Sequence, residues 1–143
     1  MKNYILKGRQ KMSEKELYKE LLIDKSKRVE TLVKKAKDIL GIDKETGEPI
    51  ILVSRARLRD EDYIALYMIG KFVASELVLS ESPCVTYTEV ANKTGIKREI
   101  VAARLSDLKK KGYARSPRRG EHEIVFPRIS DILDEVRQRV GLN

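Results

Sequence analysis

The sequence predicts a mainly α-helical fold with one small β-hairpin. Apolar residues recur at spacings of three and four in several segments, which is the period of amphipathic helices. Two short β-prone runs near the C-terminal third flank a turn that contains Pro and Gly, and this pattern indicates a hairpin. With 143 residues, 41% of them hydrophobic and 36% charged, the chain is long and apolar enough for one globular domain.

The N-terminal segment begins without a clear period. Residues 1–12 are polar and basic, which predicts a poorly ordered or strand-like start. Ser13 and Glu16 then form a capping-box pattern, so a helix is expected to begin there. Helical spacing continues as far as Gly41, the expected C-terminal stop. A polar break at residues 24–26 leaves both one long helix and two shorter helices open.

The next segment combines a loop with extended structure. Residues 42–49 have the composition of a loop, and the apolar run 50–53 predicts a short buried strand. Arg55, Arg57 and Arg59 then alternate with apolar residues at a period of two. This alternation favours a solvated edge strand, with a second nucleic-acid contact as the alternative.

A long helix is expected over residues 61–79. Asp60 is its expected cap, and the acidic residues of its first turn suit the helix dipole. Gly70 lies inside this helix, where glycine costs about 1 kcal/mol relative to alanine. We therefore expect Gly70 to permit the close approach of a neighbouring helix.

Two further helices and a tight turn are expected after a short strand at Val85. The first helix covers residues 88–94, Gly95 lies in the turn, and the second helix covers residues 98–111. The apolar stripe of the second helix recurs at spacings of four and three and is expected to face the core: Val101, Leu105 and Leu108.

The hairpin follows at once. Its strands are expected over residues 113–116 and 123–126, joined by residues 117–122, with Gly120 giving the backbone freedom that a hairpin tip needs. The single histidine, His122, is expected to be an exposed loop residue or a weak phosphate contact. A solvated hairpin without a binding role is the alternative.

Positive charge is concentrated on the second helix and the hairpin. Residues 97–119 hold nine basic and two acidic residues, so they carry +7 of the chain's net charge of +8. A solvated helix face is the simplest explanation of a basic run. Coincidence with the helix and the hairpin instead favours a surface that binds a polyanion.

Ten residues form the candidate nucleic-acid surface. The N-terminal half of the second helix offers phosphate contacts at Lys97 and Arg98, and Arg104 is the candidate for a bidentate contact with guanine. Arginines at the hairpin tip can reach phosphates or a minor groove. The full set is Lys97, Arg98, Ile100, Ala103, Arg104, Lys109, Arg115, Arg118, Arg119 and His122.

Residues 88–114 read TEVANKTGIKREIVAARLSDLKKKGYA. This stretch resembles the winged helix-turn-helix domains of bacterial and archaeal transcription regulators. The likeness extends over about residues 61–128, roughly half of the chain, with residues 61–79 as the first helix of the family and Val85 as its short first strand. None of residues 1–59 is included.

The resemblance implies a domain organisation. A winged helix-turn-helix domain is expected over residues 60–128, preceded by an N-terminal helical extension with a short strand over 1–59 and followed by a C-terminal amphipathic helix over 129–143. These parts are expected to form a single compact unit. Both terminal segments are amphipathic, and a domain of about 70 residues has little area to bury them, which predicts a homodimer through the terminal helices.

The function that follows is a duplex-DNA-binding transcription regulator. Helix 98–111 is expected to enter the major groove, and the wing, residues 115–124, to lie on the backbone or in the minor groove. Glu99 and Asp107 lie on or near the contact helix and repel phosphates. An adaptor with a winged helix that binds protein, RNA or the ribosome is therefore the alternative. A regulator that responds to a small molecule has no ligand constellation in the sequence.

Other classes of function have no support. A phosphate-cradling glycine loop is missing, and the lone His122 and lone Cys84 suggest no nucleophile–base pair, so neither an enzyme, a cofactor nor a metal site is expected. No apolar run approaches the ~20 residues that span a bilayer, and the N-terminus does not read as a signal peptide, which predicts a cytoplasmic protein. Abundant Lys, Arg and Glu without Trp hint at a thermophilic source.

Overall fold

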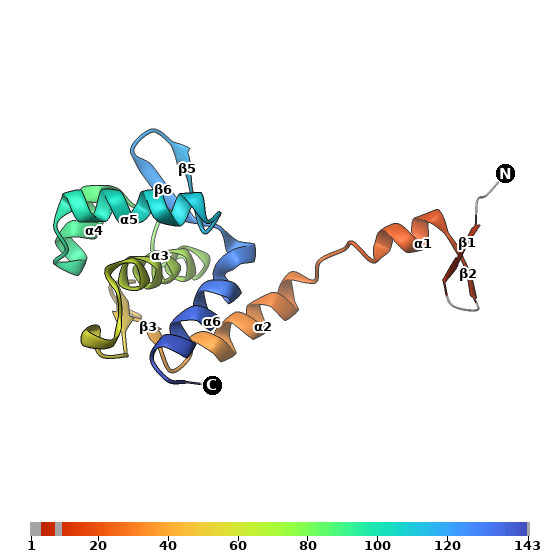
Figure 1. Ribbon diagram of the computed structural model, residues 1–143, viewed down its shortest axis with the longest axis horizontal. Coiled ribbons are helices and arrows are strands. Elements are labelled where there is room, and N and C mark those ends of the chain that lie inside the picture. Colours follow the sequence, from red (N-terminus) through yellow and green to blue (C-terminus); the bar gives the residue numbers. More distant parts are fainter. Residues whose placement is uncertain (1–3, 8–9, 143) are drawn as a thin grey trace.

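Helices dominate the structure, and small antiparallel sheets complete it (Figure 1). The computed structural model describes residues 4–7 and 10–142. In chain order the elements are β1 (Tyr4–Lys7), β2 (Gln10–Ser13), α1 (Glu14–Lys19), α2 (Lys25–Ala36), β3 (Leu40–Ile42), β4 (Pro49–Ile51), η1 (Arg55–Arg57), α3 (Asp60–Glu76), α4 (Tyr87–Thr94), α5 (Arg98–Lys110), β5 (Ala114–Arg118), β6 (Glu121–Ile124), η2 (Phe126–Arg128) and α6 (Ile129–Arg139).

The core is built around α3, the longest described helix. Most of its residues are buried, and α4, α5, α6 and the hairpin β3–β4 all pack against it. The buried apolar residues form one hydrophobic cluster, with members from α2 through α6. Within it, α3 contributes three fully buried residues: Ile64, Met68 and Ile69. No helix in the described part of the chain is long and apolar enough to cross a bilayer.

The N-terminal segment lies apart from this core. The strand-like start is confirmed for part of residues 1–12, because β1 pairs with β2; residues 1–3 and 8–9 lie outside the described residues. Ser13 caps α1 as predicted, since its hydroxyl accepts from the Glu16 N–H at 3.2 Å. Asp24 then caps α2, so two shorter helices replace one long helix. Figure 1 shows β1, β2 and α1 reaching away from the other helices.

Gly41 does not end a helix. Helix α2 ends at Ala36, and Gly41 lies in β3, where it pairs with Ile50 of β4. The prediction was wrong because apolar spacing continues past α2: Ile39 and Leu40 are buried, but from the turn after α2 and from β3. Of the expected loop 42–49, residues 43–48 form the turn of a hairpin, and Ile42 and Pro49 pair as the ends of its strands.

Gly70 permits a close approach, but of a hairpin rather than a helix. A Cβ at Gly70 would lie 2.5 Å from Cβ of Pro49 at the start of β4. Non-bonded carbon atoms do not approach so closely. The β3–β4 hairpin therefore packs against α3 in the space that the missing side chain of Gly70 leaves free.

We expect Gly70→Ala to lower the free energy of unfolding by about 1–2 kcal/mol. Alanine favours a helix by about 1 kcal/mol, but overpacking against Pro49 costs about 1–3 kcal/mol and wins. Gly41→Ala is the matched control, because a Cβ there meets nothing within 4 Å. Urea denaturation of both variants measures the difference. Stabilisation by Gly70→Ala would contradict the tight contact.

The arginines at 55–59 do not form an edge strand. Residues Arg55–Arg57 form the 3₁₀ helix η1, and two of the arginines pair with the start of α3: Arg55 with Asp60, and Arg59 with Asp62. Arg59, not Asp60, is the N-cap of α3. The period-two pattern instead reflects charge pairing with the acidic first turn of the next helix.

Acidic side chains at the start of α3 form hydrogen bonds and ion pairs with the ends of α5 and α6. Asp62 is buried and accepts from Arg59 and from Arg139 at the end of α6. Burial alone raises the pKa of Asp62, but these hydrogen bonds outweigh it and hold the pKa below the ordinary value. Lys111, which follows α5, pairs with Glu61 at 3.1 Å. The start of α3 thereby fixes the ends of α5 and α6.

Candidate nucleic-acid interface

Helices α4 and α5 are joined by a tight turn. Thr86 caps α4, its hydroxyl accepting from the Glu89 N–H at 3.1 Å. Gly95 ends the helix with φ +76°, a left-handed conformation that suits glycine. Glu89 also accepts from the Tyr67 hydroxyl of α3 at 2.8 Å, and burial together with this bond raises the pKa of Tyr67. The turn and both helices are thus held on the core.

The two faces of α5 differ as predicted. Its buried stripe is Val101, Leu105 and Leu108. The N-terminal half of the opposite face is exposed and carries four of the candidate residues: Lys97, Arg98, Ile100 and Ala103. Lys97, the N-cap residue of α5, makes no capping hydrogen bond with its side chain. The exposed end of this helix thus joins free backbone donors to two cationic side chains.

Arg98 is held in place by α4. Its guanidinium lies 5.6 Å from the ring centroid of Tyr87, and its Nε donates to the Thr88 hydroxyl at 3.4 Å. Tyr87 in turn stacks on the ring of His122, with the two centroids 4.6 Å apart. The sequence does not predict that Tyr87 and Thr88 belong to this site, because nothing in the local pattern indicates a contact with an arginine about ten residues away.

His122 is a structural residue rather than an exposed loop residue. It is buried in β6 with 3% of its surface exposed, and its backbone N–H and C=O pair with Val85 at 2.9 and 2.7 Å. This bridge confirms the extended structure expected at Val85. The prediction of an exposed loop was wrong because the turn of the hairpin is shorter than expected. His122 therefore joins the wing to the segment before α4.

The His122 ring is expected to make stability depend on pH. Burial, and then the charge of Lys109, lower the pKa of His122 from its ordinary value of 6.5. The unfolded chain binds the proton more readily, so stability decreases as the pH falls through the unfolded value. His122→Phe should flatten the profile between about pH 7.5 and about pH 5.5, as measured by urea denaturation. Equal profiles for both proteins would contradict this role.

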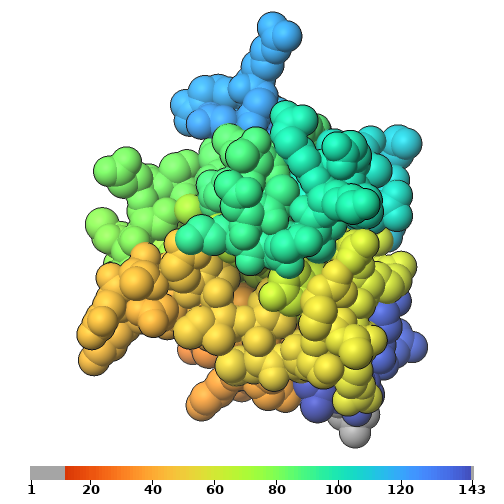
Figure 2. Space-filling view, turned by 90° about the vertical axis from the view of Figure 1, so that its left-hand side faces the viewer, coloured from red at the N-terminus to blue at the C-terminus, as the bar shows by residue number. Residues whose placement is uncertain are grey.

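The wing consists of β5, a tight turn and β6. Ala114 pairs with Ile124 and Arg118 with Glu121, with an irregularity in register between them. The tip is the two-residue turn Arg119–Gly120, where Gly120 has φ +78°. The strands begin and end one to two residues from the predicted bounds, and the connection is shorter. Figure 2 shows the wing projecting beyond α4 and α5.

Three of the candidate arginines have acidic partners. Arg104 pairs with Asp107 at 3.1 Å along α5, Arg115 with Glu123 at 2.6 Å across the wing, and Arg118 with Glu121 at 2.8 Å beside the tip. Arg115 and Arg118 are well exposed and Arg104 is half-exposed, so each pair is worth on the order of 1 kcal/mol. Their charges remain available to a stronger anion, at the cost of displacing a carboxylate.

Other cations have no such partner. In the part of the chain that the structure describes, no carboxylate lies within ion-pairing distance of Lys97, Lys109, Lys110 or Arg119. Lys97 and Arg119 are exposed, at the start of α5 and at the tip of the wing. Lys110, which was not among the predicted site residues, is exposed as well. These side chains are the strongest candidates for phosphate contacts.

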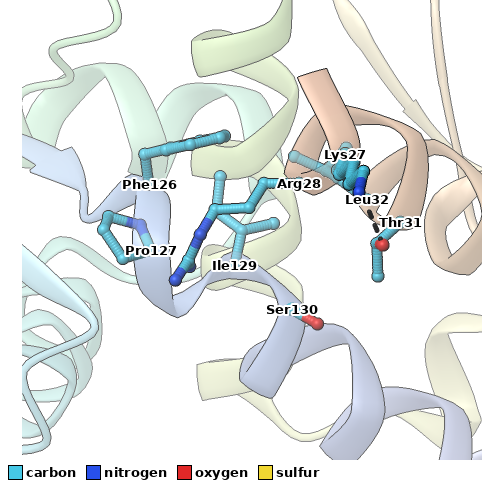
Figure 3. Close-up of a pocket in the computed structure, with 8 residues that line it drawn as sticks. All are labelled: Lys27, Arg28, Thr31, Leu32, Phe126, Pro127, Ile129 and Ser130. Atoms are coloured by element: carbon cyan, nitrogen blue, oxygen red, sulfur yellow. Dashed lines mark hydrogen bonds between the residues drawn. The ribbon is translucent and has the colours of Figure 1, made fainter. Parts of the chain in front are cut away.

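A separate pocket lies between α2 and the start of α6. Figure 3 shows Lys27, Arg28, Thr31 and Leu32 of α2, and Phe126, Pro127, Ile129 and Ser130, around a cavity of about 190 Å³. Lys27 and Arg28 at its rim make it basic. Among the described residues no group of three His, Cys, Asp or Glu side chains is arranged to hold a metal ion.

Comparisons of the chain with known proteins found no similar protein. No family model matches the chain, and neither the curated proteins nor the solved structures contain a significant match. The geometry of the site itself must therefore support any functional conclusion.

Proposed function

We propose that the chain is a winged helix-turn-helix protein that binds duplex DNA and acts as a transcription regulator. The order of elements supports the fold: α3, the Val85 bridge, α4, the Gly95 turn, α5 and the β5–β6 wing follow one another as the resemblance implies. The N-terminal segment, the β3–β4 hairpin and α6 are additions to that domain.

One observation carries the proposal. Helix α5 buries one stripe in the core and leaves its N-terminal half exposed, with Lys97, Arg98 and uncapped backbone N–H groups at the same end. The start of a helix favours anions through its dipole and its free donors. This is the arrangement with which a recognition helix approaches a phosphate backbone and then the base edges.

In this proposal, the residues of α5 and of the wing have different roles in DNA binding. Lys97 and Arg98 contact phosphates, Arg98 from a position that Tyr87 and Thr88 fix in advance. Ala103 is small and lets the helix backbone sit deep in the major groove. Arg119 at the tip of the wing reaches a second phosphate or the minor groove, which orients the helix on the duplex.

Arg104 is the residue that reads sequence in this account. To contact guanine, the Arg104 guanidinium must break its ion pair with Asp107. The loss of that pair is offset only at a guanine, where O6 and N7 accept two hydrogen bonds from the guanidinium. We expect Arg104→Ala to weaken binding by about 5- to 100-fold on preferred sites and far less on other sequences. Selection from random duplexes, followed by anisotropy titration, measures both. Arg118→Ala with Arg119→Ala is the comparison, because loss of tip cations weakens binding on all sequences alike.

The three paired arginines favour a second function. With Arg104, Arg115 and Arg118 neutralised by neighbouring acids, the surface attracts phosphates less than its sequence suggests. The alternative is an adaptor that binds protein, RNA or the ribosome, and of these a protein surface fits a mixed-charge pattern best, because RNA carries the same phosphate charges as DNA. Weak duplex affinity together with a pull-down that enriches ribosomes or one protein partner would favour this alternative.

A further inference from the structure

The N-terminal segment carries large apolar side chains that the described part of the chain leaves exposed. No residue of α1 is buried, and every residue from 20 to 31 is exposed. We call residues 13–23 the arm. Its most exposed apolar residues are Tyr18, Leu21, Leu22 and Ile23, with exposed fractions of 67%, 78%, 76% and 63%. Contiguous apolar surface of this kind marks an interaction site.

The apolar surface continues along α2 and ends in a groove. Val29 and Val33 lie one helical turn apart in α2 and are 42% and 51% exposed. Beyond Val33 lies an open apolar groove of about 250 Å³ between α2, β3 and α3; its apolar lining is Leu32, Val33, Ala36, Leu40, Ile42 and Val73. The arm therefore lies at one end of α2 and the groove at the other.

Helix α6 is excluded as the covering element. Its apolar stripe, Ile132, Leu133 and Val136, is already buried in the core. Of the two terminal segments expected to form a dimer interface, only the N-terminal one therefore has exposed apolar residues to offer. The arm of the same chain is also poorly placed, because α2 is a continuous helix of 12 residues, about 18 Å long, which separates the arm from the groove.

We propose that the groove receives the arm of a second copy, and that the protein is an arm-exchanged homodimer. A two-fold axis near Val29 makes α2 of the two copies antiparallel. The N-terminal end of one copy's α2, from which its arm extends, then lies beside the C-terminal end of the other copy's α2, where the groove opens. The contact is the same on both copies, as a two-fold interface requires.

Charge and exposed apolar surface agree with this occupant. Residues 25–37 hold six basic residues and one acidic residue, whereas the arm holds three acidic and two basic residues. Lys37 lines the groove and Lys34 is exposed beside it. Residues 14–37 offer six large exposed apolar side chains to such an interface: Tyr18, Leu21, Leu22, Ile23, Val29 and Val33.

Light scattering on the full chain in the absence of DNA tests the dimer without reference to the proposed function. We expect twice the chain mass at micromolar concentration. Leu21→Glu with Leu22→Glu in the arm, and Val33→Glu at the groove, should each raise the dissociation constant by more than about 100-fold. Circular dichroism should show unchanged helicity, since these side chains are exposed. Leu77→Glu, at an exposed leucine after α3, is the control and should stay dimeric.

A cross-link distinguishes exchange between copies from closure within one copy. In a Cys84→Ser background, one protein carries Leu22→Cys and the other carries Ala36→Cys. After mixing and mild oxidation we expect disulfide-linked pairs that contain one chain of each kind. A chain that carries both cysteines and forms the disulfide within a monomer would overturn the proposal. So would a wild-type monomer at 100 µM, or a dimer that both glutamate variants leave intact.

Discussion

Replacing Lys97 and Arg119 together by glutamate is expected to weaken duplex DNA binding by at least about 100-fold at about 0.1 M salt. Both side chains are exposed, and neither has an ion-pair partner in the described part of the chain. Because no internal carboxylate has to be displaced, their full charge is available to phosphates. Reversal removes two contacts and adds two repulsions per chain.

The salt dependence gives this prediction a second readout. Each phosphate contact releases counterions, so the slope of log affinity against log salt should fall by about 2 per chain. Lys44→Glu with Arg57→Glu is the matched control. It changes the net charge equally at exposed positions outside α5 and the wing, and it should lower affinity only a few-fold through the long-range field. Equal losses in both variants would mean that net charge alone attracts DNA.

Replacing Leu105 by alanine is expected to lower the free energy of unfolding by about 3–4 kcal/mol. Leu105 is fully buried on the stripe that fixes α5 against α3. The loss combines a transfer free energy with a cavity that the surrounding helices cannot close. It is a large fraction of the roughly 5–15 kcal/mol that stabilises a domain.

Ile100→Ala is the control on the same helix. Ile100 is 38% exposed on the opposite face, so its truncation should cost less than about 1 kcal/mol yet weaken DNA binding. Thermal and urea denaturation of the two variants measure stability, and anisotropy measures binding. If Ile100→Ala destabilised the protein as much as Leu105→Ala, the orientation of α5 would be wrong.

The sequence was most informative where one strong local signal acted alone. The stripe of Val101, Leu105 and Leu108 fixed both the existence and the orientation of α5, which begins at the predicted residue and ends one residue early. Gly95 and the Ser13 cap were read from local backbone chemistry, and both lie where they were expected. Local patterns of this kind need no knowledge of the rest of the chain.

The errors arose where a distant contact decided the outcome. His122 looked like part of a loop because its partners, Val85 and Tyr87, precede it by more than 30 residues. The alternating arginines at 55–59 looked like a strand because their acidic partners belong to the next helix. Neither contact leaves a periodic signal in the segment itself.

The charge of the candidate surface was also overestimated from the sequence. Residues 97–119 carry a net +7, but two of the acids that neutralise its arginines, Glu121 and Glu123, lie beyond that window. They meet Arg118 and Arg115 only because the wing folds back on itself. The surface is therefore a mixed one, with its free cations at the start of α5, along its last turn and at the tip of the wing.

Titration of a random-sequence duplex and of a single-stranded RNA of equal length, each at several salt concentrations, tests the central claim most directly. The account predicts that the duplex binds more tightly, with an affinity that falls steeply as salt rises, and that Lys97→Glu with Arg119→Glu lowers the slope of this dependence by about 2 per chain. Affinity that is independent of salt, or a clear preference for the RNA, would contradict the assignment of α5 and the wing to duplex DNA.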